Sequence, residues 1–99
     1  RKNSAVAKFL FFLGLAYTEK QTSFERVLAI QGRGRRYFGK SCEEIEKSGK
    51  STQPRNIPGS PYWVMTNSPT LQKRQMLRDS LKLLGYSDAA IIAAVATIR

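Results

Sequence analysis

The stretch YWVMTNSPT at residues 62–70 predicts a strand that leads directly into a helix. Its first five residues are rich in the aromatic and β-branched types that favour a β-strand. Ser68 is a good N-cap, and Pro69 fits the first helical position, where its missing N–H costs nothing. The helix is expected to run to about Leu84 and to stop at Gly85.

Upstream of this junction, residues 4–18 predict a helix whose start Asn3 or Ser4 would cap. The spacing i, i+3, i+4, i+7 is met by Val6, Phe9, Leu10, Leu13 and Tyr17. Further apolar side chains widen the face at Phe11, Phe12 and Leu15. We therefore expect this helix to be central and buried on most sides.

Capping boxes predict two shorter helices. Thr22 with Glu25 opens a helix through about Ile30, with Phe24 and Val27 among its core residues, and Ser41 with Glu44 opens one that ends near Ser48. A last helix opens at Ser87 and carries Ile91, Ile92, Val95 and Ile98.

The strand signals are fewer. A short strand is expected to start at Tyr37 and Phe38, and residues 50–61, with three prolines, form an ordered turn segment or a short edge strand. We find no internal repeat. The pattern predicts an α+β fold, a mostly helical single domain with a small β-sheet.

The charge of the chain points to a polyanionic partner. Among the 99 residues, 17 Lys and Arg outweigh 7 Asp and Glu, which gives a formal net charge of +10. Residues 31–78 hold ten of the basic groups and three of the acidic ones, a net of +7. Such an excess favours nucleic acid, an anionic membrane or an acidic protein, and the middle of the chain is the expected binding surface.

Several classes of function are disfavoured. The chain has no histidine and one cysteine, Cys42, so we expect no intrachain disulfide, no metal, no cofactor and no enzymatic activity. The apolar run Phe9–Tyr17 is far shorter than the roughly 20 residues of a membrane helix. The chain begins at Arg1 rather than Met, so we expect it to be part of a longer protein.

Two segments are the main candidates for binding. Residues 31–36 are expected to form a flexible basic loop, in which arginines offer planar forks to phosphate or guanine. Residues 66–70, followed by Lys73, combine a helix N-terminus that suits phosphate with Asn67, whose amide suits a base edge. The alternatives are a solvated charged loop and a plain helix cap.

Two weaker candidates lie elsewhere. The start of the first helix, at Ala5 and Val6, offers N–H groups to a further phosphate, although an ordinary capped helix is the favoured interpretation. Tyr62 and Trp63 could stack on a base, but a buried aromatic pair in a strand is favoured.

Taken together, these residues resemble the C-terminal domain of the SeqA family. The resemblance rests on GRGRRYF at residues 32–38 and on PGSPYWVMTN at residues 58–67, and it covers essentially the whole chain. It implies an α+β domain with a small antiparallel sheet and binding to double-stranded DNA at GATC sites that are methylated on one strand. It also implies origin sequestration, negative regulation of replication initiation, and self-association through a separate N-terminal domain that this chain lacks.

The resemblance further implies a nucleoid-associated cytoplasmic protein and a set of DNA-binding residues. Arg33 and Arg35 match loop arginines at the DNA, Asn67 matches an asparagine at the methylated A·T pair, and Ala5 and Val6 match a backbone contact to phosphate. The full set is Ala5, Val6, Arg33, Gly34, Arg35, Arg36, Tyr37, Thr66, Asn67, Ser68, Pro69, Thr70, Leu71, Gln72 and Lys73.

Two positions depart from the family pattern. Gly34 stands where a family member has threonine, and Pro69 replaces a second asparagine, which removes an amide side chain and a backbone N–H. Two other functions stay open at this point: a nucleic-acid-binding domain without sequence preference, and a domain that docks an acidic protein.

Overall fold

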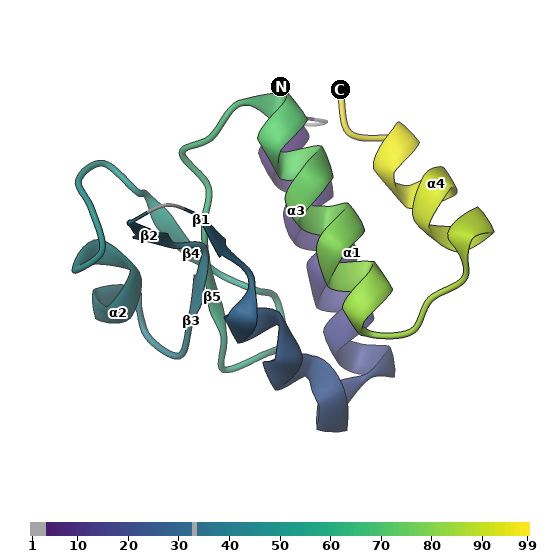
Figure 1. Cartoon of the computed structure of the whole chain (residues 1–99), viewed down its shortest axis with the longest axis horizontal. Helices are drawn as coiled ribbons and strands as arrows, with labels where there is room; N and C mark the ends of the chain where they lie inside the picture. The colour runs from purple at the N-terminus through teal and green to yellow at the C-terminus, as the bar shows by residue number, and fades with distance from the viewer. Residues whose placement is uncertain (1–3, 33) are drawn as a thin grey trace.

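Three helices form one side of the molecule (Figure 1). They are α1 (Ala5–Glu19), α3 (Thr70–Leu83) and α4 (Asp88–Ala96), and α3 packs against both of the others. The computed structural model describes residues 4–32 and 34–99. Fully or almost fully buried side chains join the three helices: Phe9, Leu13, Met76, Leu77, Leu81, Ile91 and Val95.

The strands form two small antiparallel sheets on the other side (Figure 1). In the larger one, β5 (Trp63–Met65) lies between β3 (Phe38–Gly39) and β4 (Pro54–Asn56). The smaller one pairs β1 (Gln31–Gly32) with β2 (Arg35–Arg36). The predicted mostly helical α+β fold is confirmed, and residues 50–61 contain the short edge strand that was one of the two alternatives.

The segment after α1 differs from the prediction. Residues Gln21–Ala29 form a 3-10 helix, η1, which follows Lys20 without a side-chain cap, so the expected Thr22–Glu25 capping box is wrong. A 3-10 helix places residues i and i+3 on one face, and Phe24 and Val27, both with 0% exposure, use that spacing to enter the core. The second capping prediction is confirmed: the Ser41 hydroxyl accepts from the Glu44 N–H at 3.2 Å, at the start of α2 (Cys42–Glu46).

Helix α1 is less buried than its sequence predicts. Phe11 is 61% exposed and Leu15 44% exposed, so the expectation of burial on most sides is wrong. In α4, Ile92 is likewise 68% exposed. The number of apolar residues in a helix does not show how many other elements will pack against it. Each of these two helices packs against the core with one face only.

The end of α3 follows the sequence closely. Gly85 has a φ of 90°, a left-handed conformation that glycine adopts without steric cost. Its N–H donates to the Lys82 carbonyl at 3.1 Å, and the Tyr86 N–H donates to the Leu81 carbonyl at 3.1 Å. This pair of bonds is a Schellman motif, which confirms the predicted stop of the helix.

Candidate nucleic-acid interface

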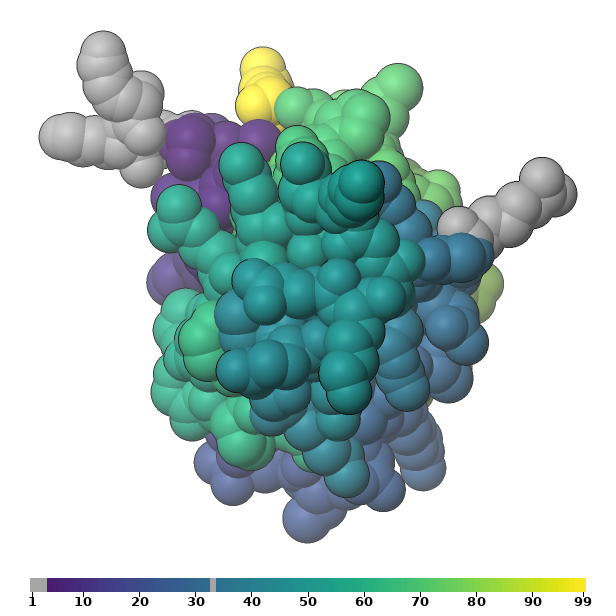
Figure 2. Space-filling model, turned by 90° about the vertical axis from the view of Figure 1, so that its left-hand side faces the viewer, coloured from purple at the N-terminus to yellow at the C-terminus, as the bar shows by residue number. Residues whose placement is uncertain are grey.

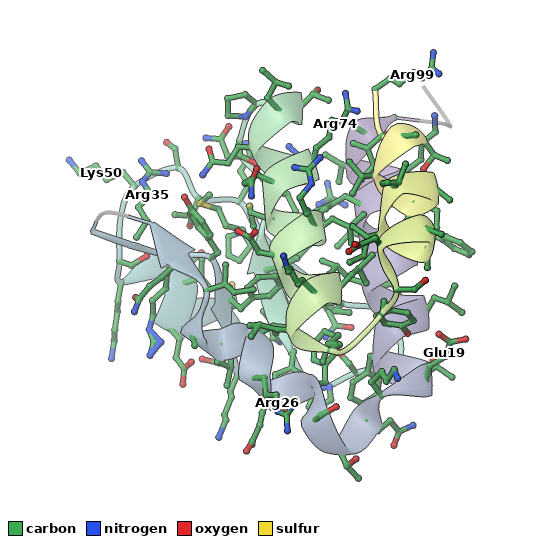
Figure 3. The ribbon with its side chains drawn as sticks, turned by 45° about the vertical axis from the view of Figure 1, so that its right-hand side comes forward. Glu19, Arg26, Arg35, Lys50, Arg74 and Arg99 are labelled. Carbon is green, nitrogen blue, oxygen red and sulfur yellow. The ribbon has the colours of Figure 1, made fainter. Side chains whose placement is uncertain are left out.

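Three segments far apart in the sequence meet beside the N-terminus of α3. We call them the basic hairpin (residues 31–36), the supporting loop (residues 49–53) and the recognition turn (residues 66–69). In Figure 3, Arg35 and Lys50 extend from the same side of the molecule, and Arg74 lies near the start of α3, whereas Glu19 and Arg26 lie at the opposite end. The grouping concentrates basic side chains around the turn.

The described residues on either side of position 33 form a short antiparallel ladder, which the prediction of a loop did not include. Its ladder pairs Gln31 with Arg36 and Gly32 with Arg35, and Gly34 turns the chain with a φ of 66°. Glycine followed by arginines was interpreted as mobile, but glycine at a positive φ is also what a tight hairpin turn needs. Arg33 lies outside the described residues.

The two described arginines of the hairpin differ in exposure. Arg35 is half-buried, with Nη1 at 3.7 Å from the Met65 sulfur and its side chain against Gly49. Arg36 is exposed, and its backbone N–H donates to the Ser48 hydroxyl at 2.9 Å. Both contacts hold the strand β2 against neighbouring segments, so the arginine side chains start from a fixed backbone.

Tyr37 connects the hairpin to both the sheet and α3. Its carbonyl accepts from the Met65 N–H at 2.8 Å, and its hydroxyl accepts from the Gln72 amide at 2.6 Å. A side chain at Gly32 would overlap the Tyr37 hydroxyl, so glycine is required for this close approach. Two predicted site residues, Tyr37 and Gln72, are thus brought together.

Asn67 is exposed to solvent, and hydrogen bonds to the supporting loop hold the recognition turn that carries it. The side-chain amide of Asn67 donates to the Ser51 carbonyl, and its backbone N–H donates to the Thr52 carbonyl at 3.2 Å. Thr66 is buried, and its hydroxyl donates to the Gln53 carbonyl at 2.6 Å. The amide of Asn67 retains its oxygen and a second N–H, one acceptor and one donor for a partner.

The start of α3 differs from the predicted cap. The helix begins at Thr70, and Pro69 is the N-cap residue, with an extended ψ of 157° and no side-chain capping bond. The expectation that Ser68 caps the helix is therefore wrong. A residue before proline avoids the helical region, which keeps Ser68 out of the helix, and its oxygens serve another partner.

That partner is Lys73, which is only 4% exposed. Its ammonium donates to the Ser68 carbonyl at 2.5 Å and to the Ser68 hydroxyl at 3.3 Å. Burial lowers the pKa of the Lys73 ammonium. This geometry gives Lys73 a role in holding the recognition turn, and the phosphate contact expected from the sequence stays a prediction.

Apolar groups flank Asn67 on the helix side. Pro69 is exposed, and Leu71, in the first turn of α3, is 75% exposed, while Thr70 is half-buried. Exposed apolar side chains thus follow the exposed Asn67 in the sequence. The first turn of α3 also contributes backbone N–H groups that suit a phosphate.

The start of α1 lies at the same end of the molecule as the start of α3 (Figure 1). The Ser4 hydroxyl accepts from the Ala7 N–H at 3.2 Å, which confirms Ser4 as the predicted cap, while the alternative Asn3 lies outside the described residues. Ala5 and Val6 are half-buried. In Figure 2, the teal middle of the chain lies between the blue hairpin segment and the purple start of α1. The start of α1 therefore lies at the same end as the start of α3, whereas the middle of the chain separates it from the hairpin (Figures 1 and 2).

Tyr62 and Trp63, at the start of β5, are both half-buried. The Tyr62 ring lies 5.3 Å from the Phe24 ring and 6.0 Å from the Tyr17 ring, and burial raises the pKa of Tyr62. Tyr62 thus packs against other aromatic rings, but the pair is half-buried rather than buried, and only Trp63 lies in the strand.

The sequence patterns missed the supporting loop. Its carbonyl groups at Ser51, Thr52 and Gln53 hold the recognition turn, and the exposed Lys50 adds charge beside Arg35. Every residue has a backbone carbonyl, so the sequence does not show which carbonyl groups accept hydrogen bonds. Lys50 was the one residue of this loop whose side chain pointed to a binding surface. Among the described residues, no cluster of His, Cys, Asp and Glu could hold a metal ion, and no helix is long and apolar enough to cross a membrane.

Comparison with known proteins gives one consistent family. A family model described as SeqA protein C-terminal domain matches residues 1–97. Two similar proteins are both named "Negative modulator of initiation of replication". The one from Idiomarina loihiensis is 44% identical over 88 residues, which cover 89% of this chain and 55% of the relative. The one from Pseudoalteromonas translucida is 46% identical over 86 residues, which cover 87% of this chain and 44% of the relative. The chain thus spans about half the length of these relatives. The crystal structure of V. cholerae SeqA superposes with a TM-score of 0.87 at 27% identity, covering 96% of this chain and 81% of that one.

Proposed function

The chain belongs to the SeqA C-terminal domain family, and from this premise we propose that it binds double-stranded DNA at GATC sites methylated on one strand. The observation that carries the proposal is the exposed Asn67, held on a rigid turn within a surface that also bears Arg35 and Lys50. The domain is a DNA-binding regulator rather than an enzyme. In the full-length protein, we propose that binding sequesters the origin and delays re-initiation of replication.

The chemistry of the methyl mark defines what a reader must do. N6-methyladenine keeps its remaining N6–H for Watson–Crick pairing, and its methyl group points into the major groove. The donor that asparagine normally uses on adenine is therefore gone, while adenine N7 and thymine O4 remain as acceptors. A reader of the methylated pair needs an apolar contact and a hydrogen-bond donor.

The recognition turn and the first turn of α3 together offer both kinds of group. Asn67 keeps one amide N–H for an acceptor on the base pair, and Leu71 and Pro69 offer exposed apolar surface at the start of α3. On the other strand, the unmodified adenine still offers its N6–H. A close acceptor from the turn would accept that N6–H and would clash with a second methyl group, which explains a preference for one methyl over two.

Positive charge supplies affinity that is independent of the methyl mark. We assign this role to Arg33, Arg35 and Arg36 of the hairpin, to Lys50, and to the backbone N–H groups at the starts of α1 and α3. Gly34 lacks the hydroxyl of threonine, and Pro69 lacks an amide side chain and a backbone N–H, at the positions where the chain departs from the family pattern. Hydrogen bonds to the bases in this chain therefore rely on Asn67 and main-chain atoms.

The full-length protein has further proposed properties. We propose that a separate domain, in the part of the protein outside this chain, mediates self-association, so that two linked DNA-binding domains engage two GATC sites. We also propose that the protein acts in the cytoplasm on the nucleoid. The described domain then supplies the DNA contact alone.

A competition experiment tests the function. The domain is titrated with one labelled GATC duplex against unmodified, singly methylated and doubly methylated competitors. Preference for the singly methylated duplex supports the proposal, equal affinities for all three favour a nucleic-acid binder without sequence preference, and no binding at moderate salt favours a domain that docks an acidic protein.

A further inference from the structure

The supporting loop has an unfavourable backbone at two positions. Ser51 has a φ of 55° and Gln53 a φ of 48°, and neither is glycine. In this left-handed region Cβ approaches a carbonyl oxygen, so L-residues with side chains avoid it. Gln53 also precedes Pro54, and a residue before proline is driven toward extended conformations. Such residues persist only where the surrounding structure determines them.

The surrounding contacts show what the strained backbone achieves. The ladder between β4 and β5 ends with Pro54 opposite Met65. Beyond it, three successive carbonyl groups of the loop face the recognition turn. Ser51 accepts from the Asn67 side chain, Thr52 and Gln53 share the Thr66 N–H at 3.2 Å each, and Gln53 also accepts from the Thr66 hydroxyl.

Burial separates the roles of backbone and side chain in this loop. Thr52, between the two left-handed residues, is 2% exposed and anchors the loop, whereas the side chains of Ser51 and Gln53 are exposed. The left-handed residues therefore act through their carbonyl groups. A change of side chain at Ser51 alters the preferred φ while leaving the carbonyl group in place.

We propose that the supporting loop is a positioning element for Asn67, and that the left-handed conformations of Ser51 and Gln53 set the methylation preference by fixing where the Asn67 amide stands. The inference rests on the proposed function for its readout on DNA. A preorganised amide loses little freedom on binding, so its misplacement costs affinity for the matched duplex more than for other duplexes.

The test is a graded series at Ser51. Glycine and asparagine accept a positive φ, alanine accepts it poorly, and valine, being β-branched, least of all. For Ser51→Gly and Ser51→Asn we expect the affinity ratio between singly methylated and unmodified duplexes to stay at the wild-type value. For Ser51→Val we expect the ratio to fall by about tenfold, which corresponds to about 1.4 kcal/mol. Ser51→Ala should lie between them.

Two further readouts separate positioning from general damage. Binding to a duplex without GATC, and its salt dependence, should be unchanged across the series, because Arg35 and Lys50 are not altered. If Ser51→Val does not fold, the order of Gly, Asn and Ala carries the test. Equal ratios across all folded variants would overturn the proposal.

A measurement on the free protein keeps this inference distinct from the proposed function. The side-chain amide of Asn67 should exchange slowly with solvent in the wild type and in Ser51→Gly, and faster in Ser51→Ala and Ser51→Val. These exchange rates are expected even if the wild-type domain shows no methylation preference. The absence of that preference would refute the proposed function but not the positioning of Asn67 by the loop. Fast exchange of this amide in the wild-type protein refutes the positioning role itself.

Discussion

The substitution Lys73→Met separates two roles for a buried charge. Methionine has a similar length and no charge, so the variant removes the ammonium that binds both oxygens of Ser68. If Lys73 holds the recognition turn, the variant should lose methylation preference. If Lys73 neutralises a phosphate, the variant should instead show a weaker salt dependence of DNA binding.

The expected magnitudes follow from the contacts. A hydrogen bond from a charged donor contributes about 1.5–3 kcal/mol to stability. Burial of the charge offsets part of this, and water can reach the half-buried Ser68 in the variant. We expect a loss of about 1 kcal/mol in the free energy of unfolding. A similar loss at the turn corresponds to about a fivefold fall in the affinity ratio between singly methylated and unmodified duplexes.

The assay combines denaturant unfolding with DNA titrations at several salt concentrations. Lys82→Met is the matched control, because Lys82 is exposed in the last turn of the same helix. One lost phosphate contact would change the slope of log affinity against log salt by about 0.9. A slope change of that size in Lys73→Met, with an intact methylation preference, would refute the positioning role of Lys73.

Three further predictions address other parts of the domain. Asn67→Ala should abolish the preference for singly methylated over unmodified DNA at a cost of about 1–3 kcal/mol in competition titrations, and a retained preference would exclude Asn67 as the base reader. Arg35→Ala should weaken binding to every duplex and reduce the salt slope by about 0.9, and an unchanged slope would place Arg35 away from the phosphates. Burial, with the hydrogen bond to Glu19, raises the pKa of Tyr86 to about 12, above its usual 10.0. The protonated Tyr86 therefore contributes fully to the stability of the folded domain below pH 10, and this contribution is lost as the pH rises toward 12. An ultraviolet titration should show one tyrosine that ionises near pH 12, and this step should be absent in Tyr86→Phe. If the step persists in that variant, the assignment to Tyr86 is contradicted.

The strand and helix at residues 62–70 were predictable because their signals are local. Aromatic and β-branched side chains indicate β5, and the leucines of α3 repeat at the helical period. The cap was mispredicted because Ser68 has two possible partners. Its hydroxyl suits a helix N–H, but the ammonium of Lys73 reaches both of its oxygens, and the pattern of caps does not include a buried lysine.

The supporting loop lay beyond sequence reasoning for a different reason. It contributes carbonyl groups, which every residue has, across 13 to 16 positions of chain to Thr66 and Asn67. The exposure of Phe11 and Leu15 was missed because the number of packing partners of α1 is set by the whole fold. Asn67 and Arg35 could be proposed as site residues from the sequence because their side chains themselves carry the groups that would contact DNA.

The most direct test of the account is a nuclear Overhauser measurement on the complex. The domain is bound to a duplex whose single N6-methyladenine carries a ¹³C-labelled methyl group, and contacts from that methyl group to the protein are recorded. The account predicts contacts to the Asn67 amide and to the Leu71 or Pro69 side chain. A methyl group without contacts to residues 66–71, in a saturated complex, would contradict it.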